Sequence, residues 1–268
     1  PAMDFVNVSG TEMNTVVATD VSFFADLAEV IQQEPEGFLG AEITGQLAAI
    51  GIEKGVEFAP DDRMQAILED AANIGEGIAR AYTYYPRDPG VKVFGEDSAW
   101  VLAYPDRNTE FMRGVARNLD GRTTYHYGYI VVSPAMAIRS AGKGSDYTMA
   151  MLDSEKRALQ GDKTYRLTLP ADIPVKDFWA VTMYDTQTRS QLQTDQQFPT
   201  LDSYAEGLQT NEDGSLDIYF APEPPEGQEA NWLQTVPGKN WFIALRMYGP
   251  LEPWINKTWR PGEIELVE

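Results

Sequence analysis

Cysteine is absent from this chain of 268 residues, and histidine occurs once, at His126. Without cysteine the chain can form no disulfide framework, no thiolate metal site and no cysteine nucleophile. A single histidine excludes a multi-histidine metal centre within one chain, and any Ser-His-Asp triad must use His126. We therefore expect a protein that folds on its hydrophobic core alone and uses neither a metal nor a cofactor.

Basic residues are scarce, since 21 Lys and Arg stand against 41 Asp and Glu, and the formal net charge is −20. Such a surface repels nucleic acid and anionic membranes, although a local basic patch can still lie within it, and we expect no nucleic-acid partner. No apolar run reaches the ~18 to 20 residues that a membrane span needs, and no charged-then-apolar leader opens the chain. The sequence therefore predicts a protein without a membrane span.

Apolar residues at helical spacing predict a helical first third of the chain. The expected helices span about residues 20–33, 41–50 and 60–82. Pro35 closes the first of them, and Gly51 suits a left-handed cap after the second. Residues 84–105 are interpreted as an irregular connector and 108–118 as a short fourth helix, whereas Phe5 to Gly10 is expected to be extended.

After Gly121 the periodicity changes to two, as Tyr125, Tyr127 and Tyr129 illustrate, and this alternation is typical of β-strands. Further strands are expected around residues 147–152, 165–169, 177–185, 216–220 and 241–248, separated by Gly-, Pro- or Asp-rich joins. The predicted fold is α+β, mainly β: an antiparallel jelly-roll β-sandwich preceded by a helical segment. We expect a helical linker at residues 1–119 and the sandwich domain at residues 120–268.

The expected strands carry an ordered series of motifs. These are Phe178-Trp179-x-Val181-Thr182-x-Tyr184-Asp185, Thr188-Arg189-Ser190, Asn211-x-Asp213-Gly214-Ser215, Asn231-Trp232-Leu233, Arg246-x-Tyr248-x-Pro250 and Trp259-x-Pro261. In order and number they resemble the carboxy-terminal domain of a bacterial two-part domain-of-unknown-function family. Members of that family look like tandem jelly-roll proteins whose two sandwiches are joined by helices, and they are often exported.

The resemblance covers the whole chain as linker helices plus the second jelly roll. It implies that an amino-terminal β-sandwich domain of the same protein is missing and is a partner of this one, so that Pro1 is a fragment or domain boundary. It also implies a periplasmic or secreted location, with a cytoplasmic location as the alternative. No reaction is established for the family, so no catalytic residue is carried over.

Three residues near the central strand are candidates for chemistry. His126, expected on a strand between tyrosines and opposite their face, is either a general base or a hydrogen-bonded structural histidine. Arg246 is in phase with Phe242 and Tyr248, and a buried guanidinium there needs a carboxylate, carbonyls or an anionic ligand. Asp185 is the available partner, so the two form either a structural ion pair or part of an anion clamp.

The candidate site therefore has catalytic and binding parts. Asp185 and His126 are the expected catalytic residues. The expected substrate-binding residues are Arg246, Arg189, Tyr184, Tyr248 and Trp232. Aromatic rings exposed on a sheet face make a sugar-stacking platform, which favours a glycan or other small-molecule ligand.

Two functions of different classes fit these residues. The first is a glycan- or envelope-component-binding domain without turnover. The alternative is a hydrolase whose carboxylate/arginine site is shared with the missing amino-terminal domain. A third interpretation is an oligomer-forming shell protein. Separately, Val21, Phe24 and Ile31, if exposed in an isolated fragment, would favour a homo-oligomer. A sandwich can host each of them, so the fold does not choose.

Overall fold

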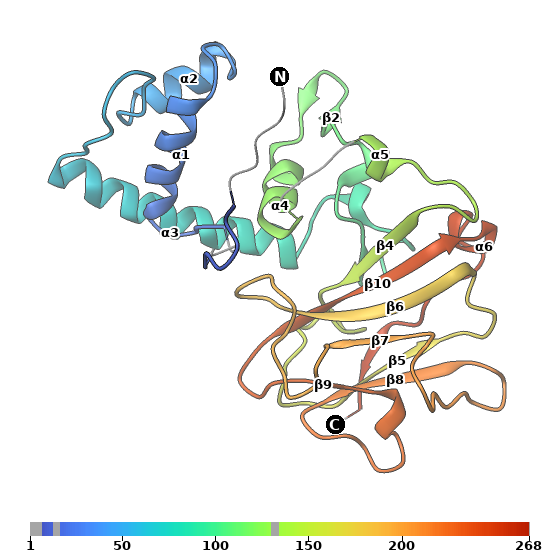
Figure 1. The fold of residues 1–268 in the computed structure, drawn as a ribbon. Helices are drawn as coiled ribbons and strands as arrows, with labels where there is room; N and C mark the ends of the chain where they lie inside the picture. The colour runs from blue at the N-terminus through green and yellow to red at the C-terminus, as the bar shows by residue number, and fades with distance from the viewer. Residues whose placement is uncertain (1–6, 13–16, 130–133, 268) are drawn as a thin grey trace. The chain divides into compact units, whose positions relative to one another are not determined.

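The computed structural model describes residues 7–12, 17–129 and 134–267. The chain divides into two compact units, residues 1–78 and 79–268 (Figure 1). The extended segment expected near the amino terminus lies partly outside the described residues, and its described end forms a turn. In the described ranges we find no helix that is both long and apolar enough to cross a membrane.

The first unit is helical, which confirms the three helices predicted there. It contains α1 (Ser22–Gln33), α2 (Ala41–Ala48) and most of α3 (Asp62–Tyr84), whose last residues belong to the second unit. Gly51 follows α2 with φ +86°, the left-handed conformation expected of a cap. The Asp61 side chain accepts a hydrogen bond of 2.7 Å from the Met64 amide and caps α3. The buried apolar side chains of this unit are Ala28, Ile52 and Leu68.

The second unit is built on two sheets. One has the strand order β1-β4-β10-β6-β7 and the other β11-β5-β8-β9; all pairs are antiparallel except β8–β9, which is parallel. The strands are β1 (Trp100–Val101), β4 (Ser145–Ala150), β5 (Tyr165–Leu169), β6 (Val175–Asp185), β7 (Thr200–Asp202), β8 (Leu216–Ala221), β9 (Trp232–Gln234), β10 (Trp241–Pro250) and β11 (Ile264–Leu266). The strands predicted after residue 140 are therefore confirmed.

The two sheets enclose one hydrophobic core. Strands β4, β5, β6, β8, β10 and β11 alternate between the two sheets along the chain. Side chains of both sheets meet in one cluster, to which the first contributes Val181 and Leu245 and the second Leu167 and Ile218, all with no exposed surface. Burying an aliphatic side chain of this size contributes roughly 1.5–3 kcal/mol, so this cluster carries much of the stability of the unit.

Residues 108–118 form a hairpin, so the short helix predicted there is wrong. Strand β2 (Met112–Arg113) pairs with β3 (Ala116–Arg117) across Gly114, whose φ is +61°. The Asn118 amide donates a 2.7 Å hydrogen bond to the Phe111 carbonyl and closes the loop. A glycine with positive φ permits this tight turn, and the apolar residues around it are too few to decide between turn and helix by periodicity.

Residues 119–129 form helix α4 (Leu119–Tyr129), so the strand predicted for the three tyrosines is wrong. The Asn118 side chain accepts a 2.9 Å hydrogen bond from the Gly121 amide, as an N-cap does. The Tyr125 ring packs beside that of Tyr129, one helical turn away, whereas Tyr127 belongs to a different cluster. Because this helix buries side chains on two sides, it lacks the single apolar stripe by which helices are recognised.

The remaining regular segments are short. They are α5 (Pro134–Ala137), α6 (Glu252–Ile255) and the 3₁₀ turns η1 (Pro89–Val91), η2 (Pro105–Arg107) and η3 (Glu229–Asn231). Together with α4, the segments around η2 and α5 supply residues to a pocket on the five-stranded sheet.

Candidate ligand-binding site

A pocket of about 570 Å³ lies on the outer face of the five-stranded sheet. Its floor comes from the central strands β4, β10 and β6, which lie side by side in Figure 1. In register, Arg246 pairs with Tyr147 of β4, and Phe242 pairs with Tyr184 of β6. Side chains alternate across a sheet, so these residues point away from the core to which Leu245 contributes.

The walls of the pocket are largely aromatic and apolar. Tyr125 and Tyr129 of α4 line it together with Tyr104 and Met136. The Tyr104 hydroxyl donates a 2.6 Å hydrogen bond to the Met136 carbonyl, and the Tyr125 ring lies 5.6 Å from that of Tyr104. Desolvation, with a smaller contribution from Tyr104, raises the pKa of Tyr125 to about 12, and it raises the pKa of Tyr129 as well. These phenols therefore stay neutral at physiological pH.

Arg246 is the half-buried charged group of the floor. It donates a short hydrogen bond from Nη2 to the Tyr184 hydroxyl, and its guanidinium lies 5.1 Å from the centre of the Tyr147 ring. Its Nε is buried and has no acceptor, and among the described residues no carboxylate lies within ion-pairing distance. Arg166 of β5 also has a buried Nε without an acceptor, but its Nη2 lies 2.8 Å from a Glu265 oxygen. Arg246 thus brings an uncompensated positive charge to the pocket.

Arg107 and Arg189 also line the pocket. Arg107 pairs with Asp146 at 2.8 Å, and the same carboxylate oxygen accepts a 2.8 Å hydrogen bond from the Trp254 indole. The Arg189 guanidinium lies 4.1 Å from the centre of the Tyr127 ring. Among the described lining residues three arginines therefore face a single carboxylate, which is already bonded. In a chain with a net charge of −20, this pocket reverses the sign of the surface locally.

The structure brings together three of the five residues predicted to bind a ligand, because Arg246, Arg189 and Tyr184 all line this pocket. Tyr248 lies on the same face of β10, but its ring stacks on Phe178 with 4.0 Å between centroids, and it does not line the pocket. Trp232 lies in β9 of the other sheet, where its indole donates a 2.9 Å hydrogen bond to the Ala221 carbonyl.

Asp185 and Arg246 do not form the ion pair expected from the sequence. Asp185 pairs in register with Trp241, five residues from Arg246 along β10 and on the opposite face. Its carboxylate lies 2.5 Å from Lys239 Nζ and accepts a 2.6 Å hydrogen bond from the Gln187 amide. Burial alone would raise the pKa of Asp185, but these bonds outweigh burial and lower its pKa.

His126 lies on helix α4 with an exposed side chain, not on a strand as expected. Partial desolvation, followed by the nearby charges of Arg189 and Arg122, lowers the pKa of His126. Both effects favour the neutral imidazole over the charged form. Neither His126 nor Asp185 lines the pocket, so the structure does not bring the expected catalytic pair together with Arg246.

Sequence reasoning missed the residues that β4, α4 and the segment around η2 supply. Tyr147 stands between the polar residues Asp146 and Thr148, so alternation alone predicts an inward position, and only strand pairing places it beside Arg246. Arg107 follows Pro105 in the irregular segment, where no periodicity indicates its direction.

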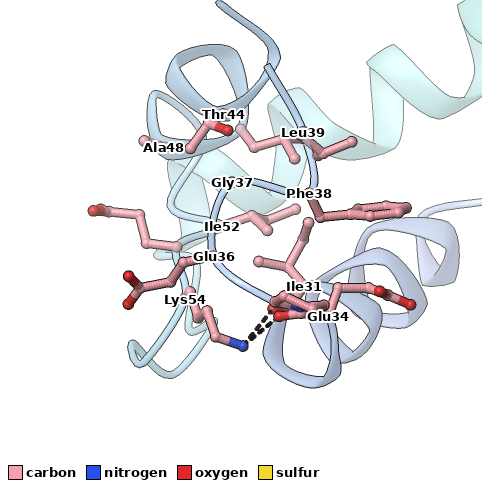
Figure 2. A pocket seen from close by; sticks show the side chains of 13 residues that line it. Ile31, Glu34, Glu36, Gly37, Phe38, Leu39, Thr44, Ala48, Ile52 and Lys54 are labelled. Carbon is pink, nitrogen blue, oxygen red and sulfur yellow. Dashed lines mark hydrogen bonds between the residues drawn. The ribbon is translucent and has the colours of Figure 1, made fainter. Parts of the chain in front are cut away.

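The first unit contains a smaller pocket of about 300 Å³ (Figure 2). Lys54 donates hydrogen bonds to the backbone carbonyls of Gln32 at 2.9 Å and Glu34 at 2.5 Å, and Figure 2 shows its ammonium directed at this end of α1. A lysine at the last carbonyls of a helix stabilises the helix end. We therefore assign Lys54 a structural role.

Fold and pocket together define an α+β protein with a cationic, aromatic-lined site on a sheet. Residues 144–252, from the first residue before β4 to the start of α6, match a family model described as "Protein of unknown function (DUF1214)". No match was found among curated proteins.

Two solved structures are similar to this chain. The VPA0106 protein from Vibrio parahaemolyticus shows 17% identity and a TM-score of 0.44, over 100% of this chain and 59% of that one. An uncharacterised protein from Burkholderia cenocepacia shows 16% identity and a TM-score of 0.35, over 92% of this chain and 50% of that one. The chain thus spans 59% of the length of the first protein and 50% of the second.

Proposed function

We propose that the pocket on the five-stranded sheet binds a small organic anion, with a carboxylate head and a ring-bearing or apolar body. The observation that carries this proposal is Arg246, a half-buried guanidinium with a buried, unpaired Nε and no carboxylate among the described residues within reach. Leaving a donor of this kind unsatisfied costs free energy, and an anionic ligand would recover it.

The chemistry of the head group follows from the guanidinium. A carboxylate can accept two parallel hydrogen bonds from one arginine, and such charge-assisted pairs are stronger than neutral ones. The Tyr184 hydroxyl already accepts a hydrogen bond from Arg246, so its own proton can be donated to the ligand. The volume of about 570 Å³ is in the range of pockets that hold small organic molecules.

Binding is better supported than hydrolysis. The expected catalytic residues Asp185 and His126 lie outside the lining, and Asp185 is bonded to Lys239. A glycan remains within the proposal if it is acidic, because the tyrosines of the pocket can stack on a sugar ring while Arg246 holds its carboxylate. A neutral glycan would leave the Arg246 charge uncompensated.

Matched pairs of compounds test the head group. Benzoate with benzamide and glucuronate with glucose differ mainly in the carboxylate, and binding raises the melting temperature by mass action. We expect the acid of at least one pair to stabilise the protein and its neutral counterpart to have no effect. The pair that responds then distinguishes an aromatic body from a sugar. Equal responses to acids and neutral compounds would contradict the proposal.

Variants test whether Arg246 binds the acid. Arg246→Met removes the charge, and we expect about a tenfold to hundredfold loss of affinity for the acid, because hydrogen bonds to charged groups contribute about 1.5–3 kcal/mol. Arg166→Met is the matched control, since Arg166 also lies on a strand with a buried Nε but outside the pocket. Calorimetric titration of both variants with the acid measures the two affinities. Unchanged affinity in Arg246→Met would place the ligand elsewhere.

A further inference from the structure

The second unit has another pocket besides that of Arg246. This second pocket, of about 440 Å³, lies where β6 ends and β10 begins. Asp185, Lys239 and Trp241 line it from the strand ends, and Arg80 and Tyr84 line it from the end of α3 within the second unit. Among the described residues none lines both this pocket and the pocket of Arg246. The two are therefore separate sites.

Trp241, which lines this pocket, differs from most of the other tryptophans in the hydrogen bonding of its indole. Four of the six tryptophan indoles donate to defined acceptors in the described structure: Trp100 to the Gly262 carbonyl, Trp232 to that of Ala221, Trp254 to Asp146 and Trp259 to the Ala171 carbonyl. Trp241 has no exposed surface, and its buried Nε1 finds no acceptor among the described residues. A buried indole normally finds an acceptor, and Trp241 packs against Tyr165 and Phe220 while lining the pocket, so its indole proton is available to an acceptor atom of a ligand there.

The charges around the pocket sum to one positive. Asp185 and Lys239, 2.5 Å apart, compensate each other. Arg80 donates to neutral oxygens only, at 3.2 Å to the Thr186 carbonyl and 3.4 Å to the Tyr127 hydroxyl. Among the described residues no carboxylate lies within ion-pairing distance of Arg80.

The rest of the lining combines the apolar side chains Met151, Leu152, Ala158 and Leu159 with the polar residues Thr186, Gln187 and Asn240. A ligand for this pocket therefore combines one negative charge, an oxygen acceptor and a short apolar body. Among simple organic groups, a monocarboxylate meets all three requirements.

We propose that this second pocket binds a small aliphatic monocarboxylate, one oxygen of which accepts the Trp241 indole proton while Arg80 balances its charge. The inference does not depend on the function proposed for the pocket of Arg246, because the two pockets share no described residue. A ligand this small is expected to bind with a Kd on the order of millimolar.

Indole resonances in a ¹H–¹⁵N spectrum of the intact protein test the proposal. The Trp241 resonance is assigned by its absence in Trp241→Phe, and acetate and butyrate are titrated against acetamide and butyramide. We expect a saturable shift of the Trp241 resonance with the carboxylates alone. Trp100 and Trp259 serve as internal references, because both indoles donate to backbone carbonyls and neither residue lines a pocket described above.

The same spectrum separates this proposal from the previous one. The Trp254 indole donates to Asp146, which lines the pocket of Arg246, so a ligand that enters only that pocket shifts Trp254 and leaves Trp241 unchanged. Arg246→Met is expected to abolish the Trp254 response and to keep the Trp241 response. If either pocket fails to bind a carboxylate, the spectrum therefore shows this independently of the other pocket.

Substitution of Arg80 completes the test. We expect Arg80→Met to lose the carboxylate response of Trp241 and Arg80→Lys, which keeps the charge, to retain it at higher concentrations. The proposal is overturned without any variant if carboxylates do not shift the Trp241 resonance of the wild-type protein. An equal response to butyramide overturns it as well, as does a Trp241 indole that exchanges magnetisation with water alone, which would mean that a bound water is its acceptor.

Discussion

The two faces of the five-stranded sheet differ sharply, although the same strands make both. On the inner face, Val181, Ile243 and Leu245 have no exposed surface and belong to the sandwich core. On the outer face, Tyr184 and Arg246 line a cationic pocket, beside a second buried apolar cluster that includes Met149, Phe242 and Ala244. The adjacent residues Leu245 and Arg246 therefore separate a core position from a position that lines the pocket. Changes at neighbouring residues should then have different consequences.

The largest expected contrast is between Leu245 and Arg246. Leu245→Ala removes a fully buried side chain from the core and should lower the free energy of unfolding by about 2–5 kcal/mol. Arg246→Met keeps most of the volume and removes a charge that no described carboxylate compensates, so we expect a change within about 1 kcal/mol. Urea denaturation of both variants measures the difference; similar losses would show that Arg246 is also structural.

Asp185 should give an intermediate effect on stability. Its nearly buried carboxylate is bonded to Lys239 and to the Gln187 amide, so Asp185→Asn should cost about 1–3 kcal/mol in the free energy of unfolding. A loss of this size without any effect on ligand affinity at the pocket of Arg246 would assign Asp185 to the fold. Lost affinity with unchanged stability would instead revive the predicted anion clamp.

The same residue predicts an acid dependence of stability. The pKa of Asp185 is lowered in the folded protein from its ordinary value of 3.8, so its stabilising contribution is complete above that value. The contribution is lost as the pH falls below 3.8 and through the lowered pKa of the folded state. Relative to Asp185→Asn, the stability advantage of the wild-type protein should therefore shrink at low pH. A constant difference from pH 6 to the acid end of the titration would refute this assignment.

The ion pair of Arg166, on the outer side of the other sheet, should contribute less to the free energy of unfolding than the bonds of Asp185. This pair with Glu265 is solvent-exposed, and such pairs contribute at most about 1 kcal/mol. Glu265→Gln should therefore change the free energy of unfolding by less than Asp185→Asn does. Measurement at low and high salt provides the control, because the small effect of an exposed pair should shrink further as salt screens it.

The smallest expected effect concerns His126, whose exposed side chain should tolerate Ala with a change within about 0.5 kcal/mol. As the only histidine, it gives one imidazole signal in a proton NMR titration. We expect its pKa below the ordinary 6.5, because partial desolvation and the Arg189 charge disfavour protonation. Arg189→Met should move the pKa of His126 back upward. A pKa at or above 6.5 in the wild-type protein would show that these groups do not act on it.

Secondary structure was predictable where one periodicity dominated the pattern. The three amino-terminal helices and the long strands from β4 to β10 were confirmed, because each has one repeating apolar pattern and clear ends. Helix α4 was mistaken for a strand because Tyr125 and Tyr127 both pack inward, on different sides of the helix. Local pattern cannot distinguish this arrangement from alternation along a strand.

The candidate site was predictable in part. The phase of Arg246 along its strand was correct, since it follows from alternation alone, and Arg189 and Tyr184 lie with it in the pocket. The pairing of Arg246 with Asp185 failed, because that expectation required the register between β6 and β10. Register depends on contacts between distant parts of the chain, so it is absent from the periodicity of either strand.

The sequence by itself determined the alternating strands, the helical first third and the chemical types present: one histidine, no cysteine and a large acidic excess. These properties follow from composition and from interactions between near neighbours. Only the tertiary structure decided which outward side chains meet, because β4, β6, β10 and α4 come from separate parts of the chain. That is why Arg246 is surrounded by aromatic rings rather than by a carboxylate, and why Trp241 is buried without an acceptor.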